Sequence, residues 1–160
     1  MDNELYQLAE QLGNRLKTNA YKIATAESCT GGWIAQTITD VPGSSAWFDR
    51  GFVTYSNNAK IQMLNVCSLT LEQYGAVSAE TAREMVAGAL AISEADWAIA
   101  VTGIAGPDGG SADKPVGTVF VAWQSSTGIS KVEKLQLTGD RHEIRKQTVI
   151  SALSGLLRLL

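Results

Sequence analysis

The stretch Thr25-Ala26-Glu27-Ser28-Cys29-Thr30-Gly31-Gly32 decides how the chain is expected to fold. It follows a mostly apolar run that starts at Tyr21, and it precedes Trp33-Ile34-Ala35-Gln36-Thr37-Ile38, a segment able to form a helix. We therefore expect a strand to end near Glu27 and a helix to begin near Gly31. The turn between them combines nucleophilic side chains, glycines that let a ligand approach the backbone, and the unpaired N–H groups of a helix start. Such a turn suits an anion or a developing oxyanion; alternatively, its hydroxyl side chains only cap the helix.

The composition is that of a single globular domain. The chain has 160 residues, of which 45% are hydrophobic and 18% charged, so residues 1–160 are long enough to bury one core. The net charge of −3 lacks the basic surface with which proteins grip nucleic acid. No apolar run is long enough to span a membrane, and the acidic start has no signal-peptide pattern. We therefore expect a cytoplasmic protein that binds neither nucleic acid nor membrane. Two cysteines and one histidine are too few for a disulfide framework or a structural zinc site.

The hydrophobic pattern predicts helices and strands that alternate along most of the chain. Helices are expected at residues 4–18, 33–38, 59–64, 69–74, 79–93 and about 140–160, and strands at 21–27, 48–55, 97–102, 118–123 and 130–137. The last strand is the most polar, which is typical of a sheet edge. This order predicts an α/β fold, namely a three-layer α/β/α sandwich with a mixed, mostly parallel sheet. Asn57-Asn58, Ser78, and Asp140 with Glu143 are the expected helix caps.

Ser28 and Cys29 are the two candidate nucleophiles of the turn. Neighbours in extended backbone point in opposite directions, so the two are not expected to share the role. A helix start can lower the pKa of a thiol, which favours Cys29; a small buried side chain is the other interpretation. A serine needs a base, and the only histidine, His142, is interpreted as a surface or capping residue at a helix start.

Lys60 is the alternative base, because burial or nearby positive charge can depress the pKa of a lysine. It follows Tyr55, which ends a predicted strand. If that strand runs parallel to the one before Ser28, both reach the same sheet edge, where ligand sites of α/β proteins form. From the pattern alone, a solvated lysine and a tyrosine at the edge of the core are the more ordinary interpretations.

The longest irregular stretch, residues 103–117, has neither the P-loop nor the dinucleotide-binding spacing. Its glycines can still present backbone N–H groups to a phosphate or carboxyl oxygen, and Lys114 adds charge. Arg141 and Arg145 lie one helical turn apart on one face. They can clamp a phosphate between them or simply be solvated.

Several motifs, spread in order over nearly the whole chain, resemble those of the CinA C-terminal domain family. They are AESCTGG (26–32), VPGSS (41–45), VTYSN (53–57) with Lys60, GAVS (75–78), TGIAGPDGG (102–110), KPVGT (114–118) and GDR (139–141). Several members of that family are nicotinamide mononucleotide deamidases of the PncC type. The resemblance implies an α/β/α domain in stand-alone form, without the N-terminal domain of larger members. It also implies hydrolysis of nicotinamide mononucleotide to nicotinic acid mononucleotide and ammonia, with no metal or other cofactor.

The resemblance also implies roles for individual residues. Ser28 matches the family's nucleophile, Tyr55 and Lys60 match its activating or proton-transfer residues, and Arg141 matches a catalytic or substrate-binding arginine. The other residues expected to bind substrate are Thr30, Gly31, Gly32, Thr102, Gly103, Ala105, Gly106 and Arg145. We also expect a homo-oligomer. The alternatives are a non-catalytic relative that binds a nucleotide-like ligand or a protein partner, and an amidase for some other small carboxamide.

Overall fold

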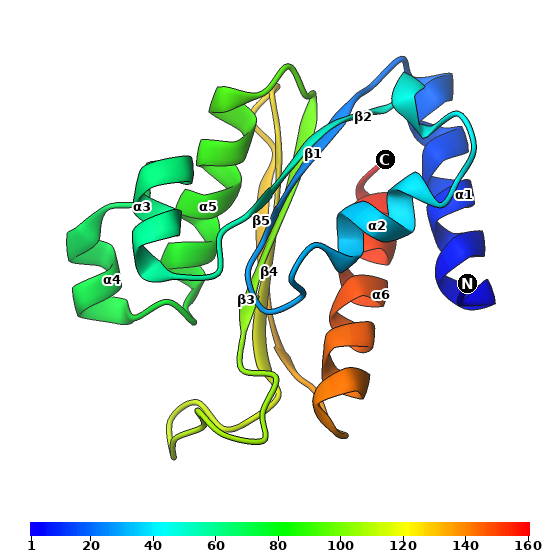
Figure 1. Ribbon diagram of the computed structural model, residues 1–160. Helices are drawn as coiled ribbons and strands as arrows, with labels where there is room; N and C mark the ends of the chain where they lie inside the picture. The colour runs from blue at the N-terminus through cyan, green and yellow to red at the C-terminus, as the bar shows by residue number, and fades with distance from the viewer.

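The computed structural model describes all 160 residues, which form one mixed sheet between two layers of helices (Figure 1). The elements are, in order, α1 (Asn3–Thr18), β1 (Ile23–Glu27), α2 (Trp33–Thr39), the short 3-10 helix η1 (Ser44–Ala46), β2 (Phe48–Val53), α3 (Asn57–Leu64), α4 (Ser68–Tyr74), α5 (Ala79–Ile92), β3 (Trp97–Gly103), β4 (Thr118–Ser125), β5 (Ser130–Gln136) and α6 (Arg141–Leu159). Each expected helix and strand is present, with ends shifted by a few residues. No helix combines the length and the apolar character that crossing a membrane requires.

The sheet has the strand order β2-β1-β3-β4-β5. Strand β1 pairs in parallel with both of its neighbours, β2 and β3. Strand β4 is antiparallel to β3 on one side and to β5 on the other. Four strands therefore run in one direction and β4 alone runs against them, which confirms the expected mixed, mostly parallel sheet. The polar strand β5 lies at an edge, as its composition predicted.

Both faces of the central strands are covered, which explains their nearly continuous apolar sequences. Side chains alternate between the faces of strand β3. Ile99 and Val101 pack with α1, α2 and α6, whereas Ala98 and Ala100 belong to the core under α5. Figure 1 shows the two layers on opposite sides of the sheet, with α3 and α4 outside α5. The three-layer α/β/α arrangement is therefore confirmed.

The helix caps largely follow the sequence signals. Ser78 caps α5, and Asp140 forms a capping box with Glu143 at the start of α6. The expected cap of α3 at Asn57-Asn58 is wrong. The cap is Ser56, whose extended backbone lets its hydroxyl accept a hydrogen bond from the N–H of Ala59 at 3.0 Å. Helix α3 consequently starts two residues earlier than expected, directly after the segment that leaves β2.

The parallel strands bring distant parts of the chain to one end of the sheet. The N–H of Thr54, just after β2, donates to the carbonyl of Glu27 at 2.8 Å, and the N–H of Ser28 donates to the carbonyl of Val101 at 3.1 Å. The loop of residues 104–117 and the start of α6 lie at this same end, which is the lower side in Figure 1. The segments that follow β1, β2 and β3 are thus neighbours there.

Gly155 permits close packing of α6 on the sheet and provides a test of this arrangement. A Cβ at position 155 would overlap the ring of Trp123, which is fully buried and donates its indole N–H to the carbonyl of Ala152 at 2.9 Å. Gly155→Ala is expected to lower the free energy of unfolding by about 1–3 kcal/mol, because overpacking outweighs the gain in helix propensity. Urea denaturation measures this difference. The neighbouring Ser154→Ala variant is the control, and a Gly155→Ala protein as stable as the wild type would contradict the packing described.

Candidate active site

A buried lysine lies against the hydroxyl of Ser28. Ser28 follows β1 directly, and Lys60 projects from α3 with only 1% of its surface exposed. The Nζ atom of Lys60 is 3.0 Å from the Oγ atom of Ser28. The same nitrogen donates to the carbonyl oxygens of Thr54 at 3.0 Å and Tyr55 at 3.2 Å. The start of α3 just after β2 is what brings this lysine under the end of β1.

The surroundings of Lys60 favour its neutral form. No carboxylate forms an ion pair with it, and burial lowers its pKa below the ordinary value of 10.5, an effect that the nearby Cys29 opposes. A neutral amine has two N–H groups and one lone pair. If the two carbonyls take the N–H groups, the lone pair faces the hydroxyl of Ser28. The geometry therefore suits Lys60 as a base for this hydroxyl.

Cys29 lacks the environment of a reactive thiol. Burial raises its pKa to about 11, with a smaller contribution in the same direction from Glu27. The thiol is therefore protonated near neutral pH, and the start of α2 does not activate it. Between the two candidate nucleophiles, the surroundings favour Ser28.

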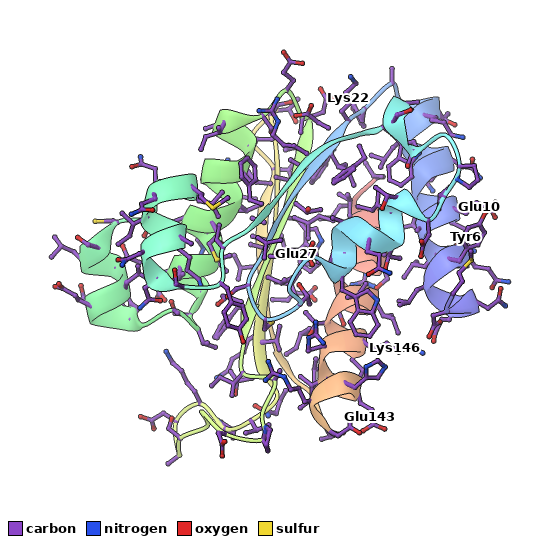
Figure 2. The ribbon with its side chains drawn as sticks, viewed as in Figure 1. Tyr6, Glu10, Lys22, Glu27, Glu143 and Lys146 are labelled. Atoms are coloured by element: carbon purple, nitrogen blue, oxygen red, sulfur yellow. The ribbon has the colours of Figure 1, made fainter.

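Glu27 holds the turn from inside the protein, a role that the sequence reasoning did not assign. Figure 2 places it between the sheet and α2, and its side chain is fully buried. Its carboxyl oxygens accept hydrogen bonds from the hydroxyl of Thr30 at 2.6 Å and from the N–H groups of Ile34 at 2.8 Å and Ala35 at 3.0 Å. The N-cap residue of α2, Gly32, has no capping side chain, so Glu27 caps this helix instead. The interpretation of the turn hydroxyls as caps is therefore wrong. A carboxyl group at the end of an apolar strand was the available signal.

The pocket beside Ser28 has a volume of about 260 Å³. It contains Ser28, Tyr55, Lys60, Thr102, Gly103, Ala105, Gly106 and Arg141, all expected at the site. The pocket is completed by Cys29, Ala76, Val77, Ile104, Asp108 and Gly109. The hydroxyl of Thr102 donates to the carbonyl of Ala76 at 2.8 Å, which joins the 75–78 segment to the end of β3. The 75–78 segment is one of the family motifs, but its residues were not expected in the site.

Arg141 joins three separate parts of the pocket wall. It is the first residue of α6, and it donates to the carbonyl of Gly106 at 2.7 Å and to the hydroxyl of Tyr55 at 3.3 Å. No carboxylate pairs with its guanidinium group, so its charge is available to an anionic ligand. Lys114, by contrast, does not line this pocket. Its Nζ donates to the carbonyl of Tyr74 at 2.7 Å and thereby ties the long loop to the end of α4.

Four of the residues expected to bind substrate lie outside this pocket: Thr30, Gly31, Gly32 and Arg145. They line a second pocket of about 460 Å³ between α1, α2 and α6. His142 lies there too, with its ring 5.0 Å from that of Trp33. The second pocket is larger, but the hydroxyl of Thr30 belongs to a fully buried side chain and donates to Glu27, whose carboxyl oxygens also cap α2. The chemistry therefore points to the pocket of Ser28. Neither pocket contains a group of His, Cys, Asp and Glu side chains able to hold a metal ion.

Known proteins resemble this chain in both sequence and overall structure. The model of the CinA C-terminal domain family matches residues 5–160. The nicotinamide-nucleotide amidohydrolase PncC of Escherichia coli (strain K12) is 53% identical over 155 residues, which cover 97% of this chain and 94% of that protein. The protein of the same name from Pseudomonas putida is 54% identical over 152 residues, or 95% of this chain and 94% of its own. The crystal structure of the competence/damage inducible protein CihA from Agrobacterium tumefaciens superposes with a TM-score of 0.97 at 46% identity, covering 99% of this chain and 97% of that one. The chain belongs to the CinA C-terminal domain family.

Proposed function

We propose that this protein is a nicotinamide-nucleotide amidase, which hydrolyses the carboxamide of nicotinamide mononucleotide to nicotinic acid mononucleotide and ammonia. The observation that carries the proposal is the 3.0 Å contact between the buried Nζ of Lys60 and the Oγ of Ser28. A serine beside a lysine whose pKa is lowered by burial has a nucleophile and a base in contact, as amide hydrolysis requires. The names of the PncC relatives support the choice of substrate.

The reaction starts when the Oγ of Ser28 attacks the carboxamide carbon and Lys60 accepts its proton. The electron pair of the C=O bond moves to oxygen, where backbone N–H groups of the turn after Ser28 or of the Gly103–Gly110 loop stabilise the charge. The ammonium group of Lys60 then gives its proton to the leaving nitrogen, and ammonia departs. Water attacks the remaining ester with Lys60 again as base, which releases the acid and restores Ser28.

The phosphate of the substrate is held at the wall of the pocket that Arg141 forms. Its phosphate pairs with Arg141, whose guanidinium group has no carboxylate partner, while the Tyr55 hydroxyl orients that arginine. Thr102, Gly103, Ala105 and Gly106 shape the wall beside the ring. The remaining expected residues, Thr30, Gly31, Gly32 and Arg145, do not touch the substrate in this arrangement and act by shaping the turn that carries Ser28. We further propose a cytoplasmic homo-oligomer that uses no metal or other cofactor and binds neither nucleic acid nor membrane, in keeping with the net charge of −3.

Release of ammonia from nicotinamide mononucleotide tests the nucleophile. Ser28→Ala is expected to lower the rate at least about 100-fold, since losing the nucleophile should cost no less than losing one oxyanion donor. The control, Cys29→Ala, is expected to keep most of the activity. The reverse result would show that Cys29 is the nucleophile. If the folded wild-type protein binds the mononucleotide but releases no ammonia, the protein is a non-catalytic relative. If it hydrolyses nicotinamide, nicotinamide riboside or the dinucleotide but not the mononucleotide, it is an amidase for another carboxamide.

The pH dependence of kcat tests the base. Only the neutral amine of Lys60 can accept a proton, so kcat at saturating substrate is expected to rise with pH through the pKa of this group. Because burial lowers that pKa, the rise should be centred below 10.5. The Lys60→Arg variant stays protonated and is expected to be inactive at every pH. A flat profile, or an active arginine variant, would show that another group takes the proton.

Arg141→Ala tests how the phosphate is held. The variant is expected to lose about 10- to 100-fold in kcat/KM for the mononucleotide, in line with the loss of a hydrogen bond to a charged group. Nicotinamide riboside, which has no phosphate, is the matched control substrate and should show a smaller loss. An unchanged KM and rate for the mononucleotide would place the phosphate elsewhere.

A further inference from the structure

Arg145 donates hydrogen bonds to the backbone of the turn that carries Ser28. Its Nε donates to the carbonyl of Cys29 and its Nη2 to the carbonyl of Thr30, both at 3.0 Å. The centre of the guanidinium group lies 5.4 Å from the ring centroid of Trp33, so the ring supports it from one side. No carboxylate forms an ion pair with Arg145. Its hydrogen bonds thus go to the turn and not to an acidic partner.

These carbonyl bonds set the direction of the neighbouring N–H groups. In a trans peptide the C=O and the N–H point in opposite directions, and the only cis peptide in the chain is Gly106–Pro107. The carbonyl of Cys29 and the N–H of Thr30 belong to one peptide unit. Because Arg145 binds this carbonyl from the side of the second pocket, the N–H of Thr30 points the other way. Arg145 lines the second pocket and not the pocket of Ser28, whereas Cys29 lines the pocket of Ser28.

Two backbone N–H groups of the turn after Ser28 have no hydrogen-bond acceptor in another residue. The N–H of Ser28 is bonded to the carbonyl of Val101 and that of Gly31 to the carbonyl of Ser28, both at 3.1 Å. The N–H groups between them, those of Cys29 and Thr30, donate to no acceptor of another residue. Two adjacent free donors directly after a nucleophile are what an oxyanion site requires.

We propose that Arg145 is a positioning residue, which holds the carbonyl of Cys29 so that the N–H of Thr30 forms the oxyanion site for the reaction at Ser28, together with the N–H of Cys29. The N–H of Cys29 shares a peptide unit with the Ser28 carbonyl, which the N–H of Gly31 holds. This inference rests on the proposed amidase function, and it gives Arg145 a different task from the substrate contact expected from the sequence. The charged guanidinium group also polarises the peptide whose carbonyl it binds, which makes the N–H of Thr30 a stronger donor. Glu27 supports the same turn through the Thr30 hydroxyl.

Steady-state kinetics of ammonia release separate positioning from binding. Arg145→Ala is expected to lower kcat about 10- to 100-fold and to leave KM nearly unchanged, because a displaced donor costs less than the hundred- to thousandfold of a removed one. Arg145→Lys keeps the charge but cannot donate to two carbonyls from a planar fork, so it should lose a similar factor. Arg158→Ala, an exposed arginine of the same helix, is the control and should match the wild type. A raised KM at constant kcat, or wild-type kcat in both Arg145 variants, would overturn the proposal.

The binding affinity of an aldehyde analogue of the substrate tests the oxyanion site directly. Nicotinaldehyde mononucleotide accepts the Oγ of Ser28 at its carbonyl carbon, and the proton completes a hemiacetal whose oxygen occupies the oxyanion site. Its affinity should fall in Arg145→Ala by the same factor as kcat/KM, whereas the affinity for the product, nicotinic acid mononucleotide, should not change. Equal losses for the two ligands would reject positioning in favour of a general loss of binding.

Two further measurements complete the test. Guanidinium ion at millimolar concentration should restore part of the activity of Arg145→Ala, and methylammonium should not. Thermal unfolding shows whether the variants fold; if neither Arg145 variant is folded, the residue is structural and the proposal fails. Wild-type protein that releases no ammonia would instead sink the proposed amidase function itself, a result distinct from every outcome for the variants.

Discussion

The contact between Lys60 and Ser28 depends on two parallel strands that end side by side. An amine buried without an acidic partner is unfavourable unless its hydrogen bonds are satisfied. Here two carbonyls just beyond β2 and one hydroxyl just beyond β1 surround the Nζ atom. The register of β1 with β2 and the early start of α3 bring these oxygens together. The ends of β1 and β2 therefore determine the position of Lys60, and the burial that they impose lowers its pKa.

The turn after β1 combines a constrained backbone with free donors. Glu27 holds it from the core, Arg145 holds its carbonyls from α6, and the N–H of Gly31 closes it on the carbonyl of Ser28. Glu27, Gly31 and Arg145 do not line the Ser28 pocket. The Ser28 hydroxyl and the next two N–H groups remain available for chemistry. A preorganised site of this kind stabilises charge without having to rearrange when the charge appears.

The local signals in the sequence predicted most of the fold, because they agree with one another. The uncharged sequences of β3 and β4, the capping box at Asp140 and the polar composition of β5 each indicated what the structure contains. The motifs of the family indicated eight of the residues that line the pocket, together with four that lie outside it. Contacts between distant segments had no such signal. Ser56 and Asn57 are both good caps, and the extended backbone of Ser56 makes it the residue that caps α3. The partners of Glu27 and Arg145 depend on how α2 and α6 pack, so neither role could be read from local spacing.

The walls of the Ser28 pocket come from both halves of the chain. Ser28 and Lys60 lie in the first half, whereas the 102–109 segment and Arg141 lie in the second, and they meet only when β3 has paired with β1. Long-range pairing of this kind is the slow part of folding, because closing the intervening loops costs chain entropy before the contacts form. A partly folded chain can therefore possess the helices and still lack the site. Recovery of catalysis after denaturation consequently reports completion of the whole sheet, which spectroscopic helix content alone does not.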